Sequence, residues 1–191
     1  MLDYYTKSEL MDMGFAFVGE NVKVFRKAQI INTKNVYLDH NCQIDDFVYL
    51  VASQNVHIGK RCHIAAFTSF IGGGEITICD YACIAIGTRL ISGSDDFSKG
   101  NGMIGPCIPI EFRCITRSKI IFNKHSICGA NSVILPGVIV GEGSAIGASS
   151  LVNKNTEAWG IYVGAPAQKI GERTKSKILG FETQLKNKYG Y

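Results

Sequence analysis

Apolar residues recur every six positions along most of this chain. The step runs through Leu38, Ile44 and Leu50, and the same triplet returns twice, each time 20 residues further on. After a break the step resumes at Phe122 and continues to Val152 without slippage. The positions that obey this rule are Leu38, Ile44, Leu50, Ile58, Ile64, Phe70, Ile78, Ile84, Leu90, Phe122, Cys128, Ile134, Val140, Ile146 and Val152. A helix repeats its apolar face at three and four residues and an ordinary strand at two, so neither explains a period of six.

Three short strands per coil do explain it, and they predict a parallel β-helix. Each hexapeptide forms one flat side of a triangular coil with its apolar residue pointing inward, and the coils stack through parallel strand hydrogen bonds. Glycine follows the inward residue at Gly59, Gly129, Gly141 and Gly147, as expected at a corner. A sandwich of alternating strands would instead need hairpin signals such as Asn-Gly between its strands. Periodicity alone does not determine the handedness of the coil.

The pattern divides the chain into three parts. Residues 1–21 form an N-terminal helical cap, in which Thr6 and Glu9 make a capping box and Gly14 ends the helix. Residues 22–168 form the β-helix, and residues 169–191 form a tail that is helical from Ile170 to Lys188. Leu90 and Phe122 lie 32 residues apart where six would continue the step, so an excursion loop of about residues 92–117 leaves the coil. A structureless loop of that length is usually functional.

Composition and charge narrow the class of protein. An apolar fraction of 46% with 19% charged residues predicts one folded domain. A net charge of +4, with a basic cluster only from Lys169 to Lys188, argues against a nucleic-acid surface. No stretch is apolar enough to span a membrane and the first residues do not resemble a signal peptide, so we expect a cytoplasmic protein.

The seven cysteines form no Cys-x-x-Cys pair. An odd number without a secretory signal predicts free thiols. We expect them to be small buried apolar residues rather than metal ligands or a nucleophile.

Residues Gly129 to Asn155, which include Leu135-Pro136-Gly137, are followed by the segment Tyr162 to Arg173 with Gly164-Ala165-Pro166-Ala167. Together they resemble the C-terminal signature of the hexapeptide-repeat acetyltransferases, which include galactoside, maltose, serine and xenobiotic O-acetyltransferases and sugar-nucleotide N-acetyltransferases. The resemblance covers about Val22 to Arg173. It implies a left-handed parallel β-helix, a homotrimer, acetyl-CoA as the acyl donor, and an active site between each pair of neighbouring subunits.

The same resemblance implies a cofactor site along the later coils. Backbone groups of small residues would bind the pantetheine amides, basic side chains would meet the phosphates of CoA, and an Ala-Pro pair would lie near the adenine. These residues are Gly129, Ala130, Gly147 and Ala148 for the pantetheine, Lys154, Lys169 and Arg173 for the phosphates, and Ala165 and Pro166 for the adenine. For each basic residue, a solvated surface charge is the alternative.

Acetyl transfer needs a general base, and four histidines are available. His63 lies in the segment CHIAAF, which resembles a segment of sugar-nucleotide N-acetyltransferases whose histidine reaches the cofactor or substrate. We therefore select it as base or acetyl-CoA contact, and the alternative is a surface or trimer-packing histidine. His57 also points outward, but on another side of the triangle. His125 lies near a corner, where a structural role is favoured, and His40 is expected to be solvated.

In xenobiotic and galactoside enzymes the catalytic histidine lies in the excursion loop, and here Asp96 occupies the corresponding position. This departure leads to the hypothesis that Asp95 or Asp96 orients His63 or binds sugar hydroxyls. The alternative for the pair is an Asx-turn at the start of the loop.

Several functions remain open at this point. The favoured one is O-acetylation of a sugar hydroxyl in surface polysaccharide or lipopolysaccharide biosynthesis, because the chain enters the coil by about Val22 with no preceding nucleotide-sugar-binding domain. The alternative is N-acetylation of a nucleotide-linked amino sugar. A non-catalytic scaffold and a zinc lyase of the carbonic anhydrase type are further rivals. The lyase needs three histidine ligands in a spacing that this chain lacks, so no metal is expected.

Overall fold

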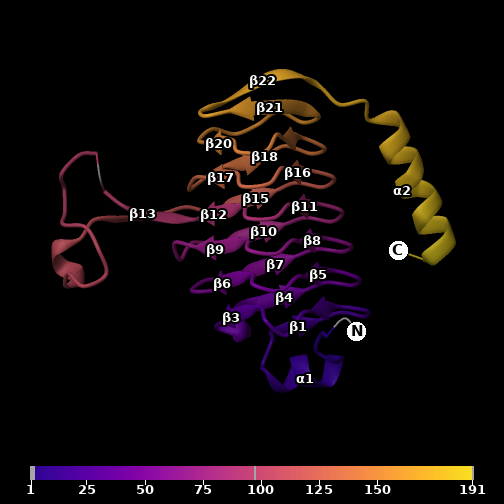
Figure 1. Cartoon of the computed structure of the whole chain (residues 1–191), viewed down its shortest axis with the longest axis horizontal. Helices are drawn as coiled ribbons and strands as arrows, with labels where there is room; N and C mark the ends of the chain where they lie inside the picture. The colour runs from indigo at the N-terminus through magenta and orange to yellow at the C-terminus, as the bar shows by residue number, and fades with distance from the viewer. Residues whose placement is uncertain (1–2, 97, 191) are drawn as a thin grey trace.

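The computed structural model, which describes residues 3–96 and 98–190, shows a stack of coils with three sides (Figure 1). The first sheet contains β1 (Phe17–Val18), β4 (Val36–Leu38), β7 (Val56–Ile58), β10 (Ile76–Ile78), β15 (Ile120–Phe122) and β18 (Ile139–Val140). The second contains β2 (Lys23–Val24), β5 (Gln43–Ile44), β8 (His63–Ile64), β11 (Cys83–Ile84), β16 (Ile127–Cys128), β19 (Ala145–Ile146), β21 (Gly160–Gly164) and β22 (Ala167–Glu172). The third contains β3 (Gln29–Ile31), β6 (Tyr49–Val51), β9 (Ser69–Ile71), β12 (Arg89–Ile91), β17 (Val133–Ile134) and β20 (Leu151–Val152).

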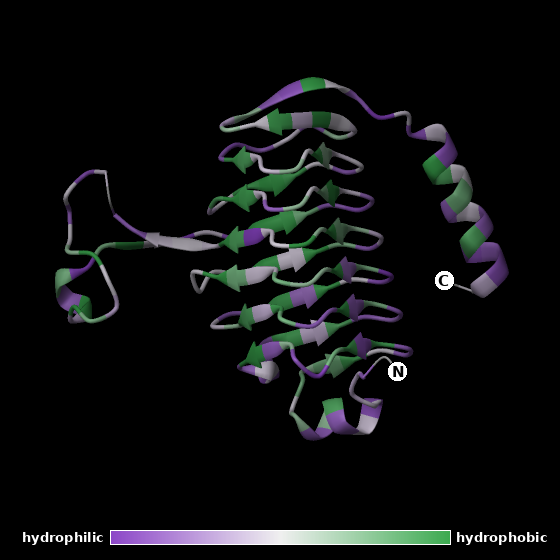
Figure 2. Ribbon diagram, in the orientation of Figure 1, coloured by the Kyte–Doolittle hydropathy of each residue, from purple (hydrophilic) through white to green (hydrophobic). Residues whose placement is uncertain are grey.

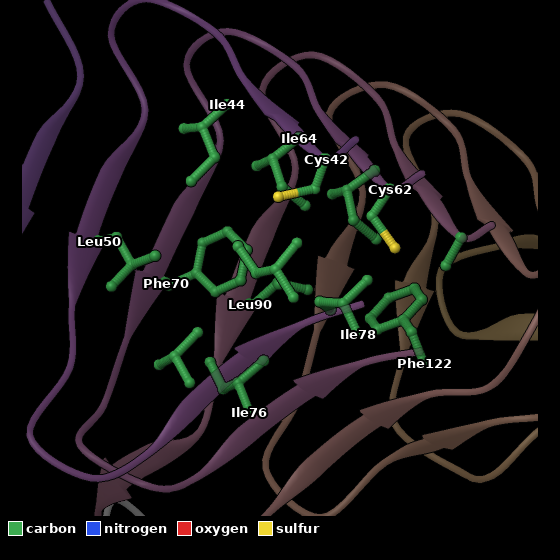
Figure 3. Close-up of a cluster of buried hydrophobic side chains, with 14 of the residues drawn as sticks. Cys42, Ile44, Leu50, Cys62, Ile64, Phe70, Ile76, Ile78, Leu90 and Phe122 are labelled. Atoms are coloured by element: carbon green, nitrogen blue, oxygen red, sulfur yellow. The ribbon is translucent and has the colours of Figure 1, made fainter. Parts of the chain in front are cut away.

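Neighbouring coils pair in the register that the repeat predicts. Ile64 pairs with Ile44 on one side and with Ile84 on the other, each 20 residues away in sequence. All fifteen positions of the six-residue step are buried, and none exceeds 3% exposure. Figure 3 shows several of them, among them Phe70, Leu90 and Phe122, converging on the axis of the coil. The predicted class, a left-handed parallel β-helix of hexapeptide repeats, is confirmed.

Hydropathy follows the same division between the inside and the outside of the coil. Hydrophobic residues dominate the strands, whereas the turns and much of α2 are hydrophilic (Figure 2). None of the helices in the described ranges is long and apolar enough to cross a membrane.

The N-terminal end of the coil is closed by the predicted helix. Helix α1 (Lys7–Asp12) begins after Thr6, whose side chain and Glu9 form the expected capping box. Leu10 is fully buried and extends the core beneath the first coil. That coil starts at β1, so it begins a few residues before the predicted boundary at Val22. A short 3-10 helix, η1 (Thr33–Asn35), lies in the first return turn.

The C-terminal end differs from the prediction of a continuous helical tail. Residues predicted as the start of that helix belong to β22, which pairs antiparallel with β21 and satisfies the backbone groups of the last coil. The helix, α2 (Ser176–Tyr189), begins only at Ser176. The structure therefore corrects the predicted tail: local helix propensity at residues 170–172 yields to the hydrogen bonds offered by an open sheet edge.

The predicted excursion leaves the coil between β12 and β15, and we call residues 92–119 the arm (Figure 1). It is not structureless. Strands β13 (Gly93–Asp95) and β14 (Ile115–Arg117) form an antiparallel stem, and η2 (Ile110–Phe112) lies near the tip. Gly72 has a φ of +100° and lies so close to Gly93 that a Cβ on Gly72 would come within 2.2 Å of the Gly93 nitrogen. Glycine at both positions lets the stem cross the preceding coil.

The cysteines are free, as predicted, but only some of them are buried. Cys42, Cys62 and Cys128 lie in the core, whereas Cys107 on the arm is exposed. Cys79, Cys83 and Cys114 are partly exposed, which corrects the expectation that all seven fill the core.

Candidate active site

The second corner of the coil, where the chain passes from the second sheet to the third, brings together the four small residues predicted to bind pantetheine. Gly129 is needed there because a Cβ would lie 2.5 Å from the backbone nitrogen of Ala148. The carbonyl of Ala130 accepts a hydrogen bond from Ser149 N at 2.8 Å, which ties the two coils together. Within residues 3–96 and 98–190, the N–H groups of Ala130 and Ala148 donate no hydrogen bond. Two amide donors are thus available to a ligand that lies along this corner.

Three residues predicted to meet the rest of CoA line a common cavity beside the last coil. Lys154, Pro166 and Lys169 belong to the lining of this cavity of about 300 Å³, and exposed Ala165 precedes Pro166 in the turn between β21 and β22. Lys169 Nζ lies 2.7 Å from Glu157 Oε2 and 3.0 Å from Glu172 Oε1. These hydrogen bonds raise the pKa of Lys169. Lys169 is therefore positively charged at neutral pH, but its ammonium group already pairs with two carboxylates.

Arg173 has a different environment from the one expected for a phosphate ligand. Its Nη1 donates to the carbonyl oxygen of His125 at 3.0 Å and to that of Gly143 at 2.7 Å. Burial lowers the pKa of Arg173. These contacts fasten the segment before α2 to the coil.

His63 lies on the outer face of the second sheet, and its side chain is 42% exposed. Its Nε2 is 2.9 Å from Oδ2 of Asp45, a residue of the preceding coil. A hydrogen bond with Cys83 and the charge and hydrogen bond of Asp45 outweigh partial burial, and they raise the pKa of His63 to about 9. His63 is therefore protonated at neutral pH and must lose that proton before it can serve as a general base.

Asp95 lies on the stem of the arm and is held by the arm itself. Its Oδ1 accepts from Arg113 Nη2 at 2.8 Å and from Nε at 3.1 Å, and its Oδ2 accepts from the backbone N–H of Gly105 at 3.1 Å. The Arg113 guanidinium, with the Gly105 amide, lowers the pKa of Asp95. This carboxylate stays charged and rigidly placed.

Asp96 has a local structural role. Its carboxylate accepts from the backbone N–H groups of Ser98, Lys99 and Asn101 at 2.9 to 3.2 Å. This is the Asx-type turn that the sequence offered as the alternative for the aspartate pair. The pKa of Asp96 is lowered, first by the hydrogen bond from Lys99 N.

Both aspartates line a cavity of about 320 Å³ at the base of the arm. Pro136, from the Leu-Pro-Gly segment, belongs to the same lining. The Leu-Pro-Gly segment of the later coils and the arm therefore line the same cavity. The sequence analysis did not predict this contact.

Within one described chain, the predicted pairing of His63 with Asp95 or Asp96 does not form. His63 bonds to Asp45, and Asp95 bonds to Arg113. The carboxylate that orients the imidazole is therefore Asp45, a residue that sequence reasoning missed. The 20-residue register could have revealed it, because Asp45 lies two residues beyond the position equivalent to His63 in the preceding coil.

The other three histidines are engaged elsewhere. His57 is on the first sheet, as predicted, and its ring stacks on Tyr37 with centroids 4.3 Å apart. His40 is not simply solvated, because its Nδ1 accepts from the backbone N–H of Glu20 at 2.9 Å. His125 is buried at a corner, stacks on Tyr81, and lies 2.6 Å from Glu182 of α2. These contacts are those of a structural residue.

Comparison with known proteins places this geometry in a class. No protein-family model matches the chain. It is 40% identical over 184 residues to the dTDP-4-amino-4,6-dideoxy-D-glucose acyltransferase of Escherichia coli, a match that covers 96% of this chain and 95% of that one. Its structure superposes with a TM-score of 0.93 and 40% identity, over the full length of both chains, on AntD, an N-acyltransferase from Bacillus cereus in complex with dTDP and 3-hydroxybutyryl-CoA. A hexapeptide-repeat acetyltransferase from Vibrio cholerae, at 19% identity and a TM-score of 0.65, shares the fold.

The fold and these relatives define the chain as an acyltransferase of the hexapeptide-repeat class that uses an acyl-CoA donor. Within that class, it belongs to the family of the dTDP-4-amino-4,6-dideoxy-D-glucose acyltransferases. The relatives favour the N-acylation alternative over the O-acetylation of a sugar hydroxyl that the sequence favoured. The early start of the coil does not argue for a sugar hydroxyl as acceptor, since a relative that this chain covers to 95% of its length is named for a nucleotide sugar.

Proposed function

We propose that this chain transfers an acyl group from acyl-CoA to the amino group of a nucleotide-linked amino sugar of the dTDP-4-amino-4,6-dideoxyglucose type. The observation that carries the proposal is the end-to-end similarity, in sequence and structure, to enzymes named for or bound to such compounds. In the reaction the amine nitrogen attacks the thioester carbonyl carbon, the bond from that carbon to the CoA sulfur breaks, and a base takes the proton released by the amine.

The proposed donor site runs along the second corner of the coil. The free N–H groups of Ala130 and Ala148 suit the pantetheine amides, and the cavity with Lys154, Lys169 and Pro166 suits the phosphate and adenine end. Gly129 and Gly147 let the coils stack closely at this corner, since a Cβ on either residue would collide with the next coil. We leave Arg173 out of the phosphate site, since its Nη1 donates to two backbone carbonyls of the coil.

The proposed catalytic groups come from two places on the chain. His63, in its neutral form, takes the proton from the amine, and Asp45 fixes the orientation of the ring. Asp95 attracts the ammonium form of the acceptor, because its carboxylate remains charged at neutral pH. Asp96 supports this arrangement by shaping the turn that follows.

A homotrimer explains how these separated groups form one site. The arm projects from the coil and carries exposed apolar residues, which are Met103, Ile104, Ile110 and Phe112. Apolar side chains on a projecting segment favour burial against a second molecule. We infer that the arm of one subunit brings Asp95 to the coil of its neighbour, and that closed three-fold symmetry repeats this contact. The proposed substrates agree with a cytoplasmic location.

A CoA-release assay across a panel of acceptors tests the proposal. The panel pairs dTDP-4-amino-4,6-dideoxyglucose with dTDP-glucose, which offers a hydroxyl in place of the amine, and includes a free galactoside. Acetyl-CoA and 3-hydroxybutyryl-CoA serve as donors. We expect release with the amino sugar to exceed release with either hydroxyl acceptor by about 10²-fold or more. Release with the hydroxyl acceptors alone would restore the O-acetyltransferase hypothesis, and CoA binding without transfer to any acceptor would support a scaffold.

A further inference from the structure

Three consecutive coils place an amide, an imidazole and a thiol side by side on the outer face of the second sheet. Gln43 pairs in register with His63, and His63 pairs with Cys83 in the next coil. The three side chains share one face and all are partly exposed. Adjacent parallel strands lie about 4.8 Å apart, so each of these side chains is within contact distance of the next.

Two hydrogen bonds join Gln43 and His63 through Asp45, and we call Asp45, His63 and Cys83 the relay. Gln43 Nε2 donates to Asp45 Oδ1 at 2.8 Å, and Asp45 Oδ2 lies 2.9 Å from His63 Nε2. Cys83 lies in the next coil, on the opposite side of His63 from Asp45. The resulting order of carboxylate, imidazole and thiol is the arrangement by which proteins activate a cysteine nucleophile.

The electrostatics of the imidazole agree with this contact. Cys83 is the largest influence on the pKa of His63, ahead of Asp45, and both raise it.

An apolar cavity adjoins the relay. It has a volume of about 400 Å³, and Gln43 and Asp45 line it together with Phe25, Phe47 and Phe67. The rings of Phe47 and Phe67 stack with centroids 5.0 Å apart and are exposed. A cavity with aromatic walls beside Gln43 and Asp45 can hold the hydrocarbon part of an acyl group.

The other cysteines lack this environment. Burial raises the pKa of Cys42 to about 12 and that of Cys128 to about 11. Cys79 is partly exposed like Cys83, but burial and the charge of Asp80 raise its pKa. Cys107 is exposed on the arm.

We propose that Cys83, activated by His63 and Asp45, is a nucleophile that accepts an acyl group from acyl thioesters such as acyl-CoA. The Cys83 sulfur attacks the thioester carbonyl carbon and forms a new carbon–sulfur bond, while the bond from that carbon to the CoA sulfur breaks. In its neutral form, His63 takes the proton of the Cys83 thiol and returns it to the departing CoA thiolate, so no other reactant is consumed. This activity uses the acyl donor of the proposed function but requires no sugar acceptor.

The test is to incubate the intact protein with acetyl-CoA or 3-hydroxybutyryl-CoA without acceptor and to follow its mass. We expect one acyl group per chain, mapped to Cys83 by peptide analysis and removed by neutral hydroxylamine, which cleaves thioesters but not amides. Cys83→Ser should abolish the hydroxylamine-sensitive label, and His63→Gln should slow its formation about 10²-fold. Cys107→Ser and Cys79→Ser are the matched controls and should label like the parent protein.

The outcomes separate this inference from the proposed function. A label on Cys107 or Cys79, an unlabelled Cys83, or labelling of Cys83 that does not change in His63→Gln overturns the inference. Because peptide mapping of the parent protein locates the label, the result does not depend on whether Cys83→Ser folds. Transfer to the amino sugar is measured separately by CoA release. If CoA is released in the presence of the amino sugar but Cys83 stays unmodified, the proposed function holds and the inference about Cys83 is wrong. If Cys83 is labelled but the amino sugar causes no CoA release, the proposed function is wrong.

Discussion

The imidazole of His63 is held by a residue of the preceding coil, with Nε2 2.9 Å from Oδ2 of Asp45. This contact links two adjacent strands of the second sheet, and it leaves the imidazole partly exposed to substrate. A base fixed in this way has one orientation on the outer face of the second sheet. The catalytic proposal for His63 depends on that fixed orientation.

His63→Ala is expected to lower the turnover of acyl transfer by about 10² to 10⁴, the range for loss of a positioned general base. The KM for acyl-CoA should change little, because the proposed donor contacts come from the later coils and from Lys154 and Lys169. Steady-state CoA release measures both quantities. His125→Ala is the matched control and should cost stability rather than turnover, because His125 contacts Tyr81 and Glu182. If His125→Ala is inactive while His63→Ala retains its turnover, the base has been misassigned.

The pH dependence of transfer should reflect the raised pKa of His63. A base must be neutral, and with a pKa of about 9 only about 1% of His63 is neutral at pH 7. The value of kcat/KM should therefore rise about tenfold per pH unit up to about pH 9 and then level off. Asp45→Asn removes one cause of the raised pKa, so the midpoint should move to lower pH. A profile that is flat between pH 6 and pH 8.5 would contradict this assignment.

Asp95→Asn should reduce turnover by about 10²-fold and leave the coil folded. The substitution removes the charge that holds Arg113 and that is proposed to attract the acceptor amine. CoA release gives the rate, and far-UV circular dichroism checks the coil. Asp96→Asn is the matched control, since the asparagine side chain retains an oxygen that can accept from the backbone of Ser98 and Lys99. An equal loss of turnover in both variants would mean that the two carboxylates serve only to hold the fold of the arm.

Glu182 is expected to hold α2 against the coil. Burial raises the pKa of Glu182, but hydrogen bonds from Lys124, Lys186 and His125 outweigh it and lower the pKa to about 2. A lowered pKa stabilises the folded state above the ordinary value of 4.5, and this stabilisation is lost as the pH falls toward 2. Glu182→Gln should therefore lower the free energy of unfolding by about 1 to 3 kcal/mol at pH 7 and by much less near pH 2.

Chemical denaturation at both pH values measures the effect of Glu182→Gln. Glu172→Gln serves as the control, because Glu172 pairs with Lys169 on the exposed surface, where an ion pair contributes little. A loss in Glu172→Gln as large as that in Glu182→Gln would argue against a specific role for the α2 contact.

The assembly is expected to be a trimer with three times the mass of 20.8 kDa for one chain. Light scattering at micromolar concentration measures it. The double variant Ile110→Ser with Phe112→Ser removes two of the exposed apolar residues of the arm and should shift the mass toward that of the single chain. A parent protein that is already monomeric would remove the proposed shared site, to which His63 and Asp95 are proposed to come from different subunits.

The sequence by itself determines which residues form the core of this protein. Each hexapeptide has one inward position, and its side chain meets the equivalent residues of the coils above and below, so position in the repeat alone decides burial. Ile64 is buried for the same reason as Ile44 and Ile84. The same register could have shown that Gln43, His63 and Cys83 form one outward column, since outward positions repeat at the same interval of 20 residues.

Only the tertiary structure decided the features outside the repeat. Arg113 meets Asp95 because the arm folds back on itself as an antiparallel stem, and no periodicity relates residues that lie 18 positions apart across a loop. Residues 170–172 form a strand because the last coil offers unpaired backbone groups. The sequence of the tail alone gives no sign of those groups, since they belong to another part of the chain. The repeat determined the scaffold and the outward position of His63, whereas the position of Asp95 came from hydrogen bonds within the arm.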